Sequence, residues 1–284
     1  MGKLTRFLQV LAEEPPFRLA AAAYVKRLSG NLRRQERWDT WSRPNYLTGV
    51  LRAADQAKIE GVPAISVFEF GVAGGNGLVA LQEVAAAVER ETGIRVSVFG
   101  FDLGHEQGLP AFSGDYRDHP DKWQTGDFPM NEPVLRARLT ERTTLILGNV
   151  AETVPHFVET ALVHPVGFVA IDVDLYSSAR DALQIFTHPK RKMLLHVPMY
   201  FDDIQFFSSH KFAGELLAID EVNRSNSGVV IDEWRGIHDR PFHERTWVRS
   251  MYVAHDLDAI SKVDPTSSSA TDRRVLTIDT PHFG

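Results

Sequence analysis

Two acidic pairs stand where apolar runs of the chain end. Asp172 and Asp174 belong to "FVAIDVDLYSS", and Asp202 and Asp203 follow "VPMYF". If both runs are parallel strands, these carboxylates emerge at the sheet edge where such folds bind ligands. Carboxylates without basic neighbours repel one another, and a hard cation that prefers oxygen ligands, such as Mg²⁺, would neutralise them. The pairs therefore indicate a Mg²⁺ site, although Asp174 could instead cap the helix that "ARDAL" predicts.

The segment "VFEFGVAGGNGLVAL" joins an apolar run to a helix-like run through Gly71, Gly74, Gly75 and Gly77. Glycine permits positive φ and close approach of a ligand to the backbone, and the following helix would present free N–H groups. The spacing does not match the G-x-G-x-x-G of folds that bind a pyrophosphate. It favours a nucleoside without phosphate, such as S-adenosylmethionine, over an NAD-dependent oxidoreductase. The alternative without a ligand is a plain strand-to-helix turn.

Asp102 closes the next apolar run, "VSVFGFDLG". A carboxylate at the end of the second strand can accept hydrogen bonds from both ribose hydroxyls of a nucleoside. It follows Gly71 at a longer interval than the roughly 20 residues usual in a dinucleotide fold. This placement also favours a bound nucleoside over an empty turn.

The elements that must position these residues are five apolar runs separated by segments long enough for helices. The runs are AISVFEF, VSVFGF, TTLILG, VGFVAID and KMLLHVP. Their nearly continuous apolar character predicts parallel strands covered by helices on both faces. Two later runs, GVVIDEW and RTWVRSMYVA, predict an antiparallel hairpin with a short polar turn. We therefore expect an α/β fold: a doubly wound, mostly parallel, Rossmann-like seven-stranded sheet with an antiparallel edge hairpin.

The remaining segments predict the organisation of the chain. We expect an N-terminal helical segment over residues 1–48, a catalytic domain over 49–260 and a tail over 261–284, which is rich in Ser, Thr and Asp. The Pro- and Gly-rich residues 108–133 predict a long loop that covers the site as a lid. Trp38, Trp41 and Tyr46, with Arg43 among them, could stack on a ligand, but such clusters more often anchor a helix on the core.

Composition limits the classes of partner. Lysine and arginine number 31 against 37 acidic residues, a net charge of −6, which argues against nucleic acid as a partner. With no cysteine, disulfides and thiolate metal sites are excluded. The apolar run LAAAAYV is too short to span a membrane, so we expect a peripheral helix, no membrane partner and a cytoplasmic protein. Homodimers are the commonest oligomers, so a homodimer is one assembly to expect.

Four ordered motifs add a resemblance. EFGVAGGNG, FDLGHEQGLP, GNVAETVP and IDVDLYSSARDAL resemble the class I S-adenosylmethionine-dependent methyltransferases of the macrocin O-methyltransferase type, which modify sugar hydroxyls on natural products. The resemblance covers roughly residues 43–205. It implies an O-methyltransferase that acts on a small-molecule acceptor such as a glycoside, with Mg²⁺ assistance.

The resemblance also implies roles for individual residues. Glu69, Gly71, Gly75 and Asn76 would line the methionine part of the cofactor, Asp102 the ribose, and Asn149 with Val150 the adenine. The complete set expected to bind S-adenosylmethionine is Glu69, Gly71, Val72, Gly75, Asn76, Asp102, Asn149, Val150 and Asp172. Asp174, Asp202 and Asp203 would bind Mg²⁺, with Asp172 as a fourth ligand or as the partner of the methionine ammonium group.

The expected reaction is displacement of the sulfonium methyl group by an acceptor hydroxyl, which needs orientation, exclusion of water and a proton acceptor. The candidate bases are His105, His119, Asp172 and Asp174, of which Asp172, Asp174 and His105 form the predicted catalytic set. Spacing does not distinguish among them. Besides the oxidoreductase, the remaining alternative is a protein that keeps the fold and binds the nucleoside without turnover.

Overall fold

The computed structural model describes residues 16–106, 108–109, 114–118 and 123–263. Within this part of the chain, seven strands form one sheet in the order β3-β2-β1-β4-β5-β7-β6. The strands, from β1 to β7, are Ala64–Phe70, Arg95–Asp102, Thr143–Leu147, Val166–Ile171, His196–Phe201, Val229–Glu233 and Met251–Asp256. The first five are parallel, and β7 runs antiparallel to both β5 and β6. The predicted fold class, with an antiparallel pair at one edge, is confirmed.

The connection between β6 and β7 differs from the expected short polar turn. Residues 234–250 join the two strands and include the helix α11 (Thr246–Arg249). The run RTWVRSMYVA therefore begins as a helix and becomes a strand only at Met251. Val248 is buried in that helix, and a short apolar run that is buried in either structure does not reveal by its pattern which one it forms.

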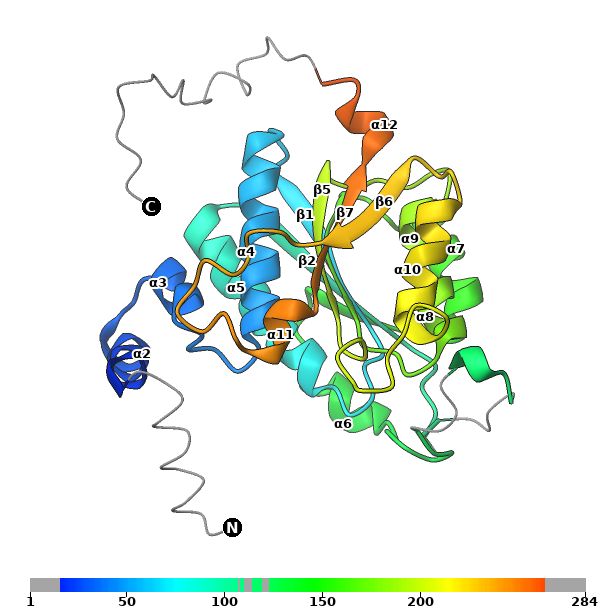
Figure 1. Ribbon diagram of the computed structural model, residues 1–284, viewed down its shortest axis with the longest axis horizontal. Helices are drawn as coiled ribbons and strands as arrows, with labels where there is room; N and C mark the ends of the chain where they lie inside the picture. The colour runs from blue at the N-terminus through cyan, green and yellow to red at the C-terminus, as the bar shows by residue number, and fades with distance from the viewer. Residues whose placement is uncertain (1–15, 107, 110–113, 119–122, 264–284) are drawn as a thin grey trace.

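Helices cover both faces of the sheet, as the continuous apolar runs predicted. In Figure 1, α4 (Pro44–Ile59) and α5 (Asn76–Thr92) lie on one side of the sheet, and α7 (Val150–Thr160), α8 (Tyr176–Ala182) and α10 (Gly214–Arg224) lie on the other. The described residues form further helices. They are α2 (Pro16–Leu28), α3 (Leu32–Arg37), η1 (Tyr116–Asp118), α6 (Glu132–Arg136), α9 (Gln184–Thr187) and α12 (Leu257–Ile260).

The core lies between the sheet and these helices. All seven residues of β1 are buried, and Phe68 stacks on Phe99 with ring centroids 5.3 Å apart, while Phe157 of α7 meets both rings edge-on. Burying a phenylalanine side chain contributes about 1.5–3 kcal/mol relative to leaving it in water. This packing fixes the strand whose carboxyl end carries Glu69 and the glycine bend.

A buried ion pair ties the N-terminal helices to the connection before β7. Arg240 donates to Asp39 Oδ1 at 2.7 Å and to Glu36 Oε1 at 3.2 Å, and Trp247 Nε1 donates to Asp39 Oδ2 at 3.2 Å. The Arg240 guanidinium also lies over the Trp247 ring, 4.4 Å from its centroid. Asp39, which has a positive φ of 49°, is held in this turn by residues that lie far away in the sequence.

The described helices include none that is both long enough and apolar enough to cross a membrane. The helix α4 contains residues on both sides of the expected boundary between residues 48 and 49, and the division into three regions stays a prediction. Residues 264–284 of the expected tail lie outside the described residues.

Candidate functional site

A pocket of about 610 Å³ opens at the carboxyl ends of β1, β2, β4 and β5. This volume is typical of sites for small ligands. The pocket lies where the strand order reverses between β1 and β4, the usual ligand position in an open α/β sheet. The pocket brings together all the described residues that the sequence singled out as site candidates. These are Glu69, Gly71, Val72, Gly75, Asn76, Asp102, His105, Asn149, Val150, Asp172, Asp174, Asp202 and Asp203. The candidate base His119 lies outside the described residues.

At Gly71 and Gly77, in the bend after β1, other chain segments occupy the space that a side chain would need. Gly71 has a φ of +87°, and a Cβ there would lie 1.9 Å from the backbone oxygen of Asp172. A Cβ on Gly77 would lie 1.8 Å from Glu69 Oε1. The bend therefore passes directly against the end of β4, while the first turn of α5 closes over the Glu69 side chain.

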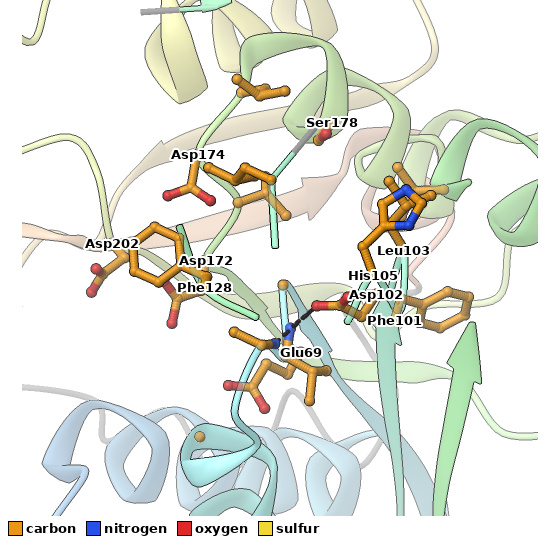
Figure 2. Close-up of a pocket in the computed structure, with 18 of the residues that line it drawn as sticks. Glu69, Phe101, Asp102, Leu103, His105, Phe128, Asp172, Asp174, Ser178 and Asp202 are labelled. Atoms are coloured by element: carbon orange, nitrogen blue, oxygen red, sulfur yellow. Dashed lines mark hydrogen bonds between the residues drawn. The ribbon is translucent and has the colours of Figure 1, made fainter. Parts of the chain in front are cut away.

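Asp102 has a structural role that sequence reasoning missed. Its Oδ2 accepts hydrogen bonds from the N–H groups of Val72 at 2.8 Å and Ala73 at 2.9 Å, and its Oδ1 accepts one from Gly104 at 2.7 Å. Two of these bonds are drawn in Figure 2. Since each carboxylate oxygen offers about two acceptor positions, Oδ1 keeps one for a ligand. Asp102 thus fixes the glycine bend and has less capacity for two ribose hydroxyls than expected.

Glu69 is buried beneath the pocket. The Tyr46 hydroxyl donates to its Oε1 at 2.9 Å, and its Oε2 has no partner among the described residues. Burial, and then the negative charge of Asp172, raise the pKa of Glu69 to about 8. A ligand that carries a positive charge or donates a hydrogen bond would satisfy this oxygen.

The acidic strand ends lie together. Figure 2 shows the carboxylates of Asp172, Asp174 and Asp202 on one side of the pocket. Burial, followed by repulsion from Asp202, raises the pKa of Asp172 to about 7. Asp202 Oδ1 accepts a hydrogen bond from the Tyr200 hydroxyl. Asp172 is therefore a carboxyl group that can change its protonation state near neutral pH.

A further carboxyl group, Glu215, stands behind Asp203. Glu215 Oε2 accepts a hydrogen bond from the Asp203 N–H at 3.1 Å, whereas its Oε1 is buried without a partner in the described part of the chain. Burial, and then the charge of Asp203, raise the pKa of Glu215 well above its usual range. A signal for this residue was present in the sequence, since an acidic residue within an apolar helical run is an exception that invites an explanation.

These acidic residues have the oxygen donors that a hard cation prefers. The repulsion that raises the pKa of Asp172 and the unpartnered oxygen of Glu215 are features that a cation would relieve. Within residues 16–263, as far as they are described, no three side chains of His, Asp or Glu are already gathered as metal ligands. The donor chemistry thus fits Mg²⁺, and the metal site remains a proposal. At the start of α8, the Ser177 N–H donates a hydrogen bond to Asp118 Oδ1 at 2.8 Å. The sequence had offered Asp174 for this capping role.

His105 and Asn149 lie on the other wall. Figure 2 shows His105 beside Asp102, across the pocket from Asp172 and Asp174. The carbonyl oxygen of His105 accepts hydrogen bonds from Gly108 and Met130, while its side chain is exposed. Asn149 caps α7 by accepting a hydrogen bond from the Ala151 N–H at 3.0 Å. The three predicted bases therefore fall into two groups, one at each wall.

The aromatic cluster before β1 anchors helices, which was the favoured interpretation. Tyr46 is fully buried, Trp38 packs edge-on against Phe242, and Trp41 donates to Gln35. The sequence did not assign Arg43 to the site, yet Arg43 lines the pocket. Its signal was the position before Pro44, at the start of a helix whose other end leads into β1.

The described parts of the predicted lid also reach the pocket. Gly108, Leu109, Trp123 and Phe128 line it. The Leu109 N–H bonds the Asp127 carbonyl at 2.7 Å, so the two ends of the loop are joined. Residues 110–113 and 119–122 lie outside the described residues, and closure of the loop over a ligand stays a prediction.

The chain matches no protein-family model and no curated protein sequence. Among solved structures, it is similar to CalS11, a calicheamicin methyltransferase, with 19% identity, a TM-score of 0.50 and coverage of 86% of this chain and 92% of that chain. It also matches the O-methyltransferase NovP, with 19% identity, a TM-score of 0.47 and coverage of 75% of this chain and 79% of that chain. At this level of identity, the similarity to CalS11 shows a shared fold, which is Rossmann-like.

Proposed function

We propose that this protein is an S-adenosylmethionine-dependent O-methyltransferase that methylates a hydroxyl of a sugar or another small-molecule diol. The observation that carries the proposal is the meeting of a glycine bend with four aspartates that follow β4 and β5, in one pocket at the switch point of the sheet. The fold shared with a calicheamicin methyltransferase supports it, although fold alone does not determine function. A natural product is the class of acceptor that this similarity suggests.

In this proposal, the cofactor lies across the pocket from Asp172 to Asn149. Glu69, Gly71, Val72, Gly75 and Asn76 contact its methionine part, and the unpartnered Oε2 of Glu69 or the Asp172 carboxylate accepts from its ammonium group. Asp102 uses the remaining acceptor position of Oδ1 for one ribose hydroxyl. Asn149 and Val150, at the start of α7, contact the adenine.

When bound, S-adenosylmethionine supplies an electrophilic methyl group, which an acceptor oxygen attacks while neutral sulfide leaves. The protein's part is to align the two, exclude water and take the hydroxyl proton. Asp172 or Asp174 takes that proton, because both lie on the wall where the acceptor would approach, and a pKa near 7 suits a base at neutral pH. His105 is the third candidate and would act from the opposite wall.

Asp174, Asp202 and Asp203 are the proposed Mg²⁺ ligands, at the ends of β4 and β5. The cation would bind two vicinal hydroxyls of the acceptor and acidify one of them. Asp172 would then face the oxygen that loses its proton. This assignment is supported by the oxygen donors and by the mutual repulsion described above.

The sheet order speaks against the oxidoreductase alternative. Folds that bind NAD typically order their strands 3-2-1-4-5-6 and carry a G-x-G-x-x-G bend. Here, the antiparallel β7 lies between β5 and β6, and the bend has a different glycine spacing. No observation in the pocket favours a nicotinamide over a methionine nucleoside.

Titration calorimetry tests the proposal. The folded protein is titrated with S-adenosylmethionine, with S-adenosylhomocysteine and with NAD⁺, and heat of binding is expected for the first two. Transfer is then measured as S-adenosylhomocysteine released in the presence of nucleotide sugars and glycosides that carry vicinal hydroxyls. Binding of NAD⁺ alone would contradict the proposal, while binding without transfer to any acceptor would favour the inactive-protein alternative.

A further inference from the structure

The pocket has a strongly unequal distribution of charge. Seven carboxyl groups line it, against one arginine and no lysine among the described residues. The carboxyl groups are those of Glu69, Asp102, Asp172, Asp174, Asp181, Asp202 and Asp203, and the arginine is Arg43. An anionic group of a ligand would be repelled from most of these walls. Among the described lining residues, Arg43 is therefore the one arginine or lysine that can attract a negative group.

Arg43 is held in place at its backbone. It is the residue before the first turn of α4, followed by Pro44 at the first helical position, and residues 45–51 of α4 are buried. Its guanidinium carbon lies 5.4 Å from the centroid of the Tyr46 ring. Tyr46 itself is fixed by its hydrogen bond to Glu69 and by edge contacts with Phe168 and Tyr200. The guanidinium thus rests on a rigid platform.

The guanidinium makes no hydrogen bond and no ion pair with any described residue. It nevertheless stands in the field of Asp172 and Glu69. Burial lowers the pKa of Arg43, but the Tyr46 phenol and the carboxyl groups of Asp172 and Glu69 outweigh burial and raise it. A half-buried guanidinium with unused donors at the wall of a pocket is suited to bind a planar oxyanion.

We propose that Arg43 binds the carboxylate of the amino-acid part of the cofactor, and that Arg43 and Glu69 together recognise a zwitterion. The inference rests on the proposed function. The ammonium group of the amino acid meets the unpartnered Oε2 of Glu69, its carboxylate meets the one arginine nearby, and Asp172 stays available to take a proton. The guanidinium can donate two parallel N–H···O bonds, which a lysine cannot reproduce.

A ligand pair tests this directly. S-Adenosylmethionine and decarboxylated S-adenosylmethionine share the sulfonium and the amine and differ in the carboxylate. Calorimetry with both ligands is done on the wild type, Arg43→Met and Arg43→Lys. Arg34→Met serves as the matched control, because Arg34 is exposed on α3 and does not line the pocket.

For Arg43→Met, we expect the affinity for S-adenosylmethionine to fall about 10- to 100-fold, the usual range for a lost hydrogen bond to a charged group. The affinity for the decarboxylated ligand should stay unchanged or rise, because a positive charge near its amine and sulfonium has been removed. Arg43→Lys should lower the affinity for S-adenosylmethionine less than Arg43→Met does. Arg34→Met should leave both affinities as in the wild type.

Binding of 5′-methylthioadenosine, which lacks the amino-acid part, reports whether the pocket of each variant is intact. If Arg43→Met lowers the affinities for S-adenosylmethionine and its decarboxylated form equally, Arg43 supports the pocket structurally and the inference is wrong. If it weakens neither, the carboxylate is bound elsewhere, for example by the N–H groups of the glycine bend, and the inference is also wrong. If the wild type binds none of the three nucleosides, the proposed function itself fails, and the inference fails with it.

Discussion

The hydroxyl of Tyr46 donates a 2.9 Å hydrogen bond to Oε1 of Glu69, and both residues are buried. This bond links α4 to β1 directly beneath the pocket, so it couples the stability of the fold to the shape of the site. The other carboxyl oxygen, Oε2, has no hydrogen-bond partner among the described residues.

Tyr46→Phe should therefore lower the free energy of unfolding by about 1–3 kcal/mol, because it leaves a buried carboxyl oxygen without a donor. Urea denaturation followed by circular dichroism measures the change. Tyr24→Phe is the matched control, since Tyr24 is 60% exposed on α2. Equal stabilities of the two variants would mean that the Tyr46 bond contributes nothing to stability.

Gly77→Ala should destabilise the protein by about 1–3 kcal/mol, the usual cost of overpacking a closed site, because its methyl group would meet Glu69 Oε1. Gly74→Ala lies in the same bend, with open space around its Cβ position and no positive φ. We expect its free energy of unfolding to stay within about 0.5 kcal/mol of the wild type. Thermal melts of both variants measure the difference, and a Gly77→Ala variant as stable as Gly74→Ala would contradict the close approach of α5 to Glu69.

Glu215 should make stability depend on pH. Its folded pKa lies above the ordinary value of 4.5, so the stability that its protonated form gives is complete below pH 4.5 and is lost as the pH rises. In EDTA, Glu215→Gln should be more stable than the wild type at pH 8 and closer to it at pH 4.5. Glu141→Gln, at an exposed position, is the control. Melting temperatures that fall equally with pH in the wild type and in Glu215→Gln would show that this carboxyl group is not responsible.

The paired His196 and His255 should act in the opposite direction. Their Nδ1 atoms lie 2.8 Å apart across β5 and β7, so one ring must donate and the other accept. Burial lowers the pKa of His196 below 6.5, and the charges of His255 and Arg52 lower it further. Burial also lowers the pKa of His255 below 6.5, although the negative charge of Asp232 acts in the opposite direction. Folding thus favours the neutral rings, and the stability they give is complete above pH 6.5 and is lost as the pH falls.

His255→Gln should therefore reduce the loss of stability between pH 7.5 and 5.5. His156→Gln, at an exposed position on α7, should lose stability as the wild type does. Chemical denaturation at the two pH values measures both. The opposite result, a steeper loss in His255→Gln, would indicate that protonation strengthens this contact.

Asp172 predicts the pH dependence of the proposed transfer. If it is the base, the rate falls as the pH drops below about 7, the pKa that burial and Asp202 give it. Asp172→Asn should lower the rate by about 10²- to 10⁴-fold and remove this limb of the profile. Mg²⁺ beside Asp202 should shift the acidic limb of the pH–rate profile to lower pH, and removal of Mg²⁺ with EDTA should move this limb back to its original pH. An unchanged limb in Asp172→Asn would instead direct attention to Asp174 or His105.

The sheet and the strand ends could be predicted because burial on both faces leaves a continuous apolar run, and the acidic residues then stand at the ends of these runs. β1 occupies the whole of the expected run AISVFEF. The segment that contains α11 could not be predicted in the same way, since Val248 is buried in a helix as it would be in a strand. Pattern alone does not distinguish these structures when the run is short.

The site was predictable in its residue types more than in its bonds. The spacing around Gly71 and the position of Asp102 identified the pocket, but the three backbone N–H groups that Asp102 accepts from depend on how the chain turns after β1 and β2. Arg43 and Glu215 were missed because their roles arise from neighbours that are distant in the sequence. Burial and charge at those positions appear only after the strands are placed side by side.

The ion pair between Arg240 and Asp39 has a consequence for biosynthesis. The turn that precedes Arg43 is fixed by Arg240, which lies between β6 and β7, so a nascent chain that has emerged only as far as β5 has all the strand ends of the pocket but lacks this ion pair. Ribosome-bound intermediates of that length would carry an incomplete wall on the side of Arg43. Completion of the pocket on this side thus requires translation to pass Arg240.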